Sequence, residues 1–167
     1  TGKAANVKVG FIFLHDENST YDKNFITAAE EACKKAGVEI LKETNISETQ
    51  ACYDAAAELV DEGCNVIFAD SFGHEPYVIQ AAKKFPEVQF LHATGTKAHT
   101  EGLSNYHNAF ASIYEGRYLA GVAAGMKLNE MISSGKITAD KAKMGYVGAY
   151  TYAEVISGYT SFYLGAK

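Results

Sequence analysis

The chain has 167 residues, of which 47% are hydrophobic and 2 are proline, and its formal net charge at pH 7 is −5. This size allows one folded domain, or one domain with part of another, around a buried core. The negative charge argues against a protein that binds the phosphate backbone of nucleic acid, and no apolar run reaches the roughly 18 residues of a membrane-spanning helix.

The first predicted strand lies in the segment VKVGFIFLHDENSTYDKNF, residues 7–25. Residues 7–14 are almost all apolar, which favours a central parallel strand that is covered on both faces. The polarity reverses at His15, and Thr20 or Asp22 can cap the helix that follows. Because open α/β sheets bind ligands beyond the carboxyl ends of their strands, this loop is the first candidate site.

Strands and helices then alternate along the chain. Short apolar runs predict four further strands, at residues 38–41, 65–69, 88–92 and 103–107. Ser47 and Gln50 form a capping box for a helix that Gly63 stops, and Pro76 and Pro86 mark the start and end of the next helix. A long helix rich in small residues, a strand and a final helix follow, at residues 110–127, 144–149 and 151–165. This alternation predicts an α/β fold with a parallel sheet.

Polar and aromatic side chains accompany the ends of four predicted strands. They are His15, Asp16 and Tyr21 for the first strand, Asp70, Ser71 and Phe72 for the third, Thr94 and Gly95 for the fourth, and Asn105, His107 and Asn108 for the fifth. Aromatic rings offer faces for stacking, and carboxylates and amides offer directional hydrogen bonds, so this mixture suits a small, uncharged, planar, polar ligand. Phosphate fits poorly, because no glycine-rich phosphate-binding loop follows any strand.

Several of these residues also have a purely structural interpretation. Asp16 and Asp70 can cap the helices that follow them, and Phe25 and Phe72 can belong to the core. The sequence predicts no metal site and no cofactor. The cysteines lack the spacing of metal ligands and are expected to be buried thiols: Cys33, Cys52 and Cys64.

Four segments, which cover nearly the whole chain, carry a resemblance: VGFIFLHDENSTYDKNF, ADSFGHEPYVIQAAKKFPEVQFLHATG, NYHNAFASIYEGRYLAGVAAGM and KMGYVGAYTYAEVISGYTSFYLGAK. The chain resembles the basic membrane protein family of substrate-binding lipoproteins, and within it the purine nucleoside receptor A group. EGRYLAG is the most specific part of the likeness. The resemblance implies a type I periplasmic-binding fold, in which two α/β lobes flank a hinge. Each lobe has a doubly wound parallel sheet, with flavodoxin-like strand order in the first.

The resemblance also implies a role in transport and not in catalysis. The expected partners are a purine nucleoside or related solute, held between the lobes, and an ABC permease in the membrane. The expected location is extracytoplasmic, with a lipid anchor whose segment is absent from this chain. Residues 1–106 would form the first lobe, and residues 107–167 the hinge crossing and the start of a truncated second lobe. Uncovered apolar faces then predict either a piece of a longer chain or a homodimer through residues 110–167.

Ligand-binding residues follow from the same resemblance. The expected set consists of Asp16 for a hydrogen bond to the base, Tyr21 or Phe25 for stacking, Phe72 as an aromatic after the third strand, Asn105 at the hinge crossing, and Ser71 and Thr94 at neighbouring strand ends.

Two other classes of protein compete with this interpretation. A phosphorelay receiver domain has acids after its first strand, a phospho-accepting Asp after its third and a Thr or Ser after its fourth, which Asp16, Asp70 and Thr94 match. A receiver also needs a Lys after the fifth strand, where this chain has Tyr106 to Asn108. A nucleoside-processing enzyme is the other alternative, but the nucleophile-elbow and deaminase motifs are absent from the sequence.

Overall fold

The computed structural model describes residues 7–167. The chain forms two compact units, of which the first ends at Phe110 and the second is Ala111–Lys167. The lobes expected at residues 1–106 and 107–167 are ligand-binding lobes. A division into compact units does not test which residues bind a ligand. That assignment therefore stays a prediction.

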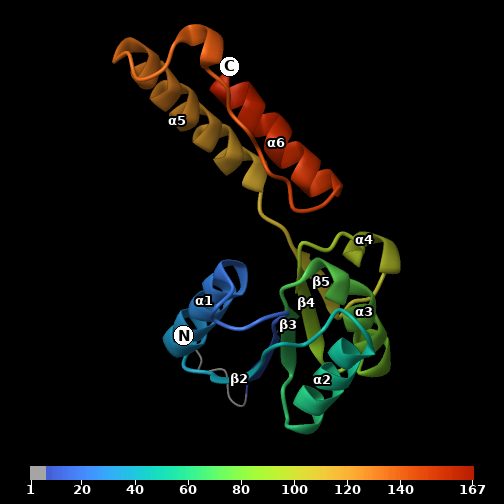
Figure 1. Cartoon of the computed structure of the whole chain (residues 1–167). Helices are drawn as coiled ribbons and strands as arrows, with labels where there is room; N and C mark the ends of the chain where they lie inside the picture. Colours follow the sequence, from blue (N-terminus) through green and yellow to red (C-terminus); the bar gives the residue numbers. More distant parts are fainter. Residues whose placement is uncertain (1–6) are drawn as a thin grey trace. The chain divides into compact units, whose positions relative to one another are not determined.

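A five-stranded parallel sheet forms the centre of the first unit (Figure 1). Its strands are β1 (Lys8–Ile12), β2 (Glu39–Glu43), β3 (Val66–Ala69), β4 (Gln89–Ala93) and β5 (Tyr106–Ala109), and their order is β2-β1-β3-β4-β5. Every neighbouring pair is parallel. The predicted parallel sheet, its flavodoxin-like order and the central position of the first strand are all confirmed.

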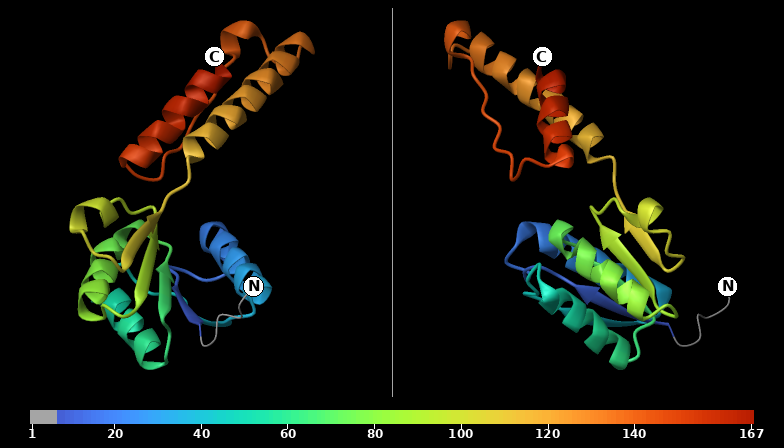
Figure 2. Two further views of the ribbon diagram at one scale, coloured as in Figure 1. Left: turned by 180° about the vertical axis from the view of Figure 1, so that it is seen from behind. Right: turned by 90° about the vertical axis from the view of Figure 1, so that its right-hand side faces the viewer.

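Helices cover both faces of this sheet. α1 (Thr20–Ala36) packs Ile26 and Ala29 against the buried Phe13. α2 (Gln50–Asp61) and α3 (Glu75–Lys84) lie on the opposite face, as Figures 1 and 2 show, over a larger core that includes Leu59 and Phe90. A short η1 (Phe72–His74) leads into α3, and α4 (Ala98–Glu101) precedes β5. The sheet is thus doubly wound.

Two predicted helix caps are wrong by one to three residues. Ser19, and neither Thr20 nor Asp22, is the N-cap of α1: its Oγ accepts from the Asp22 amide at 3.3 Å and donates to the Asp22 carboxylate at 2.6 Å. Asp22 occupies the N3 position of a capping box, but the box is incomplete, because the Ser19 amide donates to the Asp16 carbonyl and not to the Asp22 carboxylate. α2 is capped by Thr49, whose Oγ1 accepts from the Ala51 amide, and Ser47 instead hydrogen-bonds Thr49.

The second unit is a parallel pair of helices, in which residues 117, 121 and 125 of the first lie beside residues 158, 162 and 166 of the second. Its elements are α5 (Ile113–Ser133), the short η2 (Ala139–Lys141) and α6 (Ala153–Ala166). The strand predicted at residues 144–149 is wrong, because this segment makes no strand pairing. No other described residue of the second unit is in a strand, so the backbone of the segment has nothing to pair with. Its Tyr146 ring packs edge-on against Phe162 of α6, at a centroid distance of 5.2 Å.

Glycines let α5 and α6 approach closely. A Cβ atom at Gly121 would lie 2.1 Å from the Phe162 carbonyl oxygen, and one at Gly165 would lie 2.1 Å from that of Tyr118. Any larger side chain would push the helices apart. The close packing that the small residues predict is therefore confirmed. No helix in residues 7–167 combines the length and apolar character needed to cross a membrane.

Candidate functional site

The carboxyl ends of β1 and β3 form the centre of the candidate site. β1 continues into α1 on one face of the sheet, whereas β3 continues into α3 on the other face. The two connections diverge at this point, which is where open α/β sheets leave a crevice for ligands. The first loop and the residues that follow β3 come together here: the Tyr21 hydroxyl donates to the Asp70 carbonyl at 2.7 Å.

Asp16 lies at the tip of the first loop and is partly exposed. Its Oδ1 accepts hydrogen bonds from the backbone and side-chain amides of Asn18, both at 2.9 Å. These bonds, the backbone one foremost, lower the pKa of Asp16 below its ordinary value. The side chain is therefore an ionised hydrogen-bond acceptor at neutral pH.

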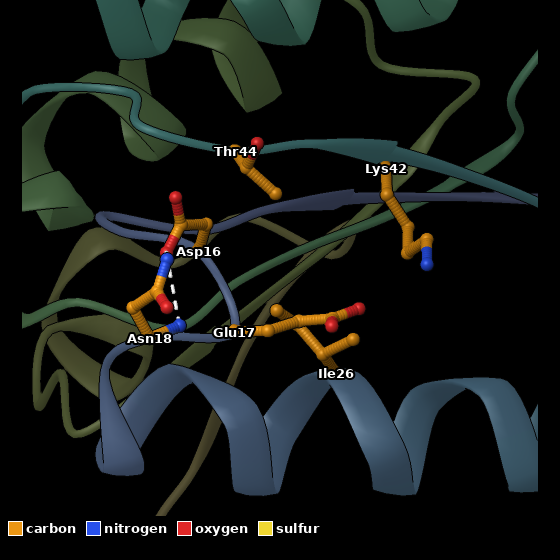
Figure 3. Close-up of a pocket in the computed structure, with 6 residues that line it drawn as sticks. All are labelled: Asp16, Glu17, Asn18, Ile26, Lys42 and Thr44. Carbon is orange, nitrogen blue, oxygen red and sulfur yellow. Dashed lines mark hydrogen bonds between the residues drawn. The ribbon is translucent and has the colours of Figure 1, made fainter.

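A pocket of about 340 Å³ opens beside Asp16 (Figure 3). It lies between the first loop, α1 and the end of β2, and its lining consists of Asp16, Glu17, Asn18, Ile26, Lys42 and Thr44. Lys42 forms an ion pair with Glu30 of α1, so its charge is already partnered. The pocket combines polar acceptors with one apolar wall, and it is poor in free positive charge.

Aromatic rings follow the first loop, at the start of α1. Tyr21 is 45% exposed, and its ring centroid lies 5.0 Å from that of the half-buried Phe25. Phe25 in turn lies 6.3 Å from Phe68 of β3 and packs against the α1 core. Tyr21 is thus the more exposed of the two rings, and Phe25 packs beside it.

The loop after β3 contributes Ser71 and Phe72. Phe72 is 40% exposed, as a ligand-contacting ring requires. Ser71 is buried, and its hydroxyl donates to Glu48, which also accepts from the Gly73 amide at 2.8 Å. Burial acts to raise the pKa of Glu48, but these two hydrogen bonds lower it overall. Ser71 therefore fixes the loop that presents Phe72.

Thr94 follows β4 in a strained conformation. Its φ is 70°, in the left-handed region that β-branched residues rarely adopt. Its Oγ1 is buried and has no hydrogen-bond partner in the described part of the chain. A buried hydroxyl without a partner at the edge of a crevice is a candidate to contact a ligand.

Glu75 shapes the same edge, although the sequence does not predict it as a site residue. This buried carboxylate accepts hydrogen bonds from the Thr96 and Lys97 amides at 2.8 and 2.9 Å and from the Tyr106 hydroxyl at 2.9 Å. It fixes the loop after β4, on which Thr94 lies. A Glu directly before Pro76 signals only the start of a helix, so nothing in the local sequence shows this contact.

Asn105 does not lie at the carboxyl edge, and its predicted placement is wrong. β5 begins at Tyr106 and not at residue 103, so Asn105 precedes the strand at its opposite end. It is 4% exposed, and its Nδ2 donates to the carbonyl oxygens of Ala82, Phe85 and Val88. Asn105 therefore ties the end of α3 to β4, which explains its presence without a ligand.

Asp22 and Asp70 form a buried carboxyl pair beneath the first loop, whereas the sequence predicts only two separate helix caps. Asp22 is 1% exposed and Asp70 is fully buried. Burial, followed by the charge of Asp22, raises the pKa of Asp70 to about 8. A buried, protonated carboxyl group is a poor phosphate acceptor, which argues against the receiver-domain alternative.

The described residues contain no cluster of His, Cys, Asp or Glu that is suited to a metal ion. The three cysteines are free and buried, and burial raises the pKa of Cys52 to about 12. They are inert structural thiols, as the sequence predicted.

A comparison with protein families assigns this architecture. A family model described as "ABC transporter substrate-binding protein PnrA-like" matches residues 12–167. The chain belongs to this family. The family assignment confirms the resemblance to the basic membrane proteins.

Two curated relatives of this family member are informative. The chain is 34% identical over 166 residues to a purine-binding protein of Brucella abortus, a match that covers 96% of the chain and 43% of the relative. It is 33% identical over 103 residues to a putative ABC transporter glucose-binding protein of Haloferax volcanii, which covers 62% of the chain and 22% of the relative. The chain therefore spans less than half the length of either relative.

Solved structures agree on the fold. An ABC transporter solute-binding protein from Conexibacter woesei superposes with a TM-score of 0.62 at 18% identity, over 71% of this chain and 40% of that one. A transcriptional activator of the comK gene from Bacillus halodurans superposes with a TM-score of 0.67 at 20% identity, over 95% of this chain and 49% of that one. Together with the family assignment, these likenesses show a type I periplasmic-binding-like fold.

Proposed function

We propose that this family member supplies one wall of the solute site in the receptor of an ABC importer, and that the solute is a purine nucleoside or base. One observation carries the proposal: an ionised acceptor, Asp16, on the connection between β1 and α1, and a partly exposed aromatic ring, Tyr21, in the first turn of α1, both follow β1 where it diverges from β3. A purine needs a directional acceptor for its ring N–H or amino group and a flat face for stacking. The similarity to a purine-binding protein of Brucella abortus supports the same solute class.

Each site residue has a distinct part in this proposal. Asp16 accepts a hydrogen bond from the base, and Tyr21 stacks on it with Phe25 as its support. Phe72 forms a second apolar wall on a loop that Ser71 holds. The Thr94 hydroxyl supplies a further polar contact.

The wider role follows from the family. We propose that the intact protein is extracytoplasmic and lipid-anchored, that it delivers the solute to an ABC permease, and that it does no catalysis. A bound solute that is released unchanged after incubation would support this role. Conversion of the solute to product would support the nucleoside-processing alternative.

Glucose is the second candidate solute, because one relative is named a putative glucose-binding protein. Sugars also stack on aromatic rings and bind carboxylates, so Asp16 and Tyr21 do not exclude them. A thermal-shift panel of adenosine, guanosine, adenine and glucose, with acetyl phosphate plus magnesium as a further arm, separates the possibilities. We expect stabilisation of the intact protein by purines alone. Stabilisation by glucose alone, or by acetyl phosphate alone, would contradict the proposal.

We further propose that the 167-residue chain, when studied by itself, self-associates through residues 110–167. This segment exposes an unusual number of large apolar side chains, which water disfavours: Leu119, Met126, Val147, Tyr150, Tyr163 and Leu164 are each more than half exposed. Light scattering on the purified chain tests this. A well-folded monomer at micromolar concentration would contradict it.

A further inference from the structure

Two buried carboxyl groups hold the loop that carries Asp16. The Asp22 carboxylate accepts from the His15 amide at 3.0 Å and from the Ser19 hydroxyl at 2.6 Å, and it lies 3.2 Å from His15 Nδ1. Asp70 Oδ1 accepts from the Leu14 amide at 3.3 Å. Both ends of the loop are therefore tied to this pair, and Asp16 lies between them.

If both carboxyl groups of the pair are ionised, one of their oxygen atoms is a buried acceptor without a donor. In the described part of the chain, Asp70 Oδ2 is buried and receives no hydrogen bond. The neighbouring Asp22 carboxylate has no proton to offer it. One proton on Asp70 removes this defect, because the resulting O–H donates to Asp22 and one buried charge disappears.

The protonation of the two groups agrees with this geometry. Burial and the charge of Asp22 hold the pKa of Asp70 near 8. Burial also acts to raise the pKa of Asp22, but hydrogen bonds from Ser19, the His15 amide and Asp70 lower it overall. At neutral pH the pair therefore holds one proton, which belongs to the two groups jointly.

We propose that Asp22 and Asp70 act as positioning residues: they share one proton, and this shared proton fixes residues 14–19 in the conformation in which Asp16 and Tyr21 receive the solute. Tyr21 is included because its hydroxyl donates to the Asp70 carbonyl. Loss of the proton places two like charges side by side in a buried position. The loop is then released, and the site loses its shape. This inference rests on the proposed function of the site.

Two other titratable groups, His15 and His74, interact with Asp22, and Glu48 interacts with both histidines. His15 contacts Asp22 from the loop, and its side chain is 60% exposed. His74, at the end of η1, is buried, and burial lowers its pKa, so this ring is neutral at physiological pH. Its Nε2 lies 2.9 Å from the Ile46 carbonyl. Glu48, which precedes α2, is ionised and is held by Ser71 and Gly73. None of these groups supplies a donor to Asp70 Oδ2.

The test uses the intact protein and three variants. Asp70→Asn keeps a hydrogen-bond donor but does not ionise, Asp22→Asn removes the charged acceptor, and Asp61→Asn is a matched control at an exposed carboxyl on α2. Carbon-13 NMR of the labelled aspartates follows the ionisation of Asp70. Hydrogen-exchange protection factors of residues 14–19 report the loop, and adenosine is the binding probe.

We expect Asp70 to titrate near pH 8 in the wild type and the control, and at lower pH in Asp22→Asn. Protection of residues 14–19 should fall above that pH in the wild type but not in Asp70→Asn. If only the protonated form binds, the Kd for adenosine should rise about tenfold between about pH 7 and pH 9 in the wild type and stay constant in Asp70→Asn.

Three results would overturn the inference. They are an ordinary pKa for Asp70, loop protection that is independent of the pair, and one pH dependence of adenosine binding that the wild type and Asp70→Asn share. If no form binds adenosine while loop protection still follows Asp70, the proposed solute is wrong and the coupling of the pair to the loop is right.

Discussion

The Tyr21 hydroxyl donates a hydrogen bond to the backbone carbonyl of Asp70 across 2.7 Å. This bond joins the first turn of α1 to the end of β3, two segments that are distant in the sequence. It fixes the orientation of a partly exposed ring at the start of α1, directly after the connection from β1 that carries Asp16. The bond therefore gives the candidate site a rigid aromatic wall before any ligand arrives.

The Tyr21 hydroxyl can be removed without removing the ring. We expect Tyr21→Phe to lower the free energy of unfolding by about 0.5 to 1.5 kcal/mol, the usual net value of one hydrogen bond, and to weaken purine binding only slightly. Tyr21→Ala also removes the stacking face and should weaken binding further. Urea unfolding and calorimetry with adenosine measure the two effects. Equal affinities for the Phe and Ala variants would show that the ring does not contact the solute.

Phe72 should contribute in the same way from the segment that follows β3. We expect Phe72→Ala to weaken purine binding by about 0.5 to 1.5 kcal/mol beyond the effect of the lost buried area, because a stacking face disappears. Calorimetry and thermal unfolding are both needed. A variant that loses stability but keeps its affinity would place Phe72 in the core and not in the site.

The Asp22–Asp70 pair makes stability depend on pH with a definite sign. The unfolded chain releases the Asp70 proton near its ordinary pKa of 3.8, while the folded chain keeps it to about pH 8. The folded state thus holds more protons between these values, so this contribution to stability falls as pH rises, by at most about 1.4 kcal/mol per pH unit. We expect urea unfolding of Asp70→Asn to show a flatter pH profile than the wild type in this window. Parallel profiles would contradict the shared proton.

The α5–α6 contact depends on glycine. Gly121→Val places a branched side chain where even a Cβ atom would lie 2.1 Å from the Phe162 carbonyl oxygen. We expect a loss of about 1 to 3 kcal/mol in the free energy of unfolding, the usual range for overpacking. Gly116→Val is a suitable control, because a Cβ there meets no atom closer than 4.0 Å. Equal losses in both variants would mean that helix propensity, and not the close approach, sets the cost.

Local patterns predicted most of the first unit. Apolar runs identify strands because a strand that is buried on both faces consists of a short, nearly continuous run of apolar residues. The alternation of these strands with helices then predicts a parallel sheet. Positions decided by tertiary contacts were harder to predict. The start of β5 depends on the contacts that Asn105 makes with α3, and the strand predicted at residues 144–149 has no pairing partner among the described residues of its unit.

The candidate site likewise contains residues that local sequence patterns predict and residues that only tertiary contacts reveal. Asp16, Tyr21 and Phe72 are found from their place after apolar strands, whereas Glu75 and the Asp22–Asp70 pair become visible only in three dimensions. Each of these carboxyl groups precedes or begins a helix, so its local sequence signals a cap. Its function as a buried acceptor comes from partners far along the chain.

The most direct test of the account is calorimetric titration of the intact protein with adenosine and with glucose, in the wild type, Asp16→Ala and the Asp61→Asn control. We expect the wild type and the control to bind adenosine and not glucose. Asp16→Ala should bind adenosine about tenfold to a hundredfold more weakly, because a purine donor is left buried without its charged acceptor. Unchanged adenosine affinity in Asp16→Ala, or binding of glucose without any binding of adenosine, would contradict the proposed site.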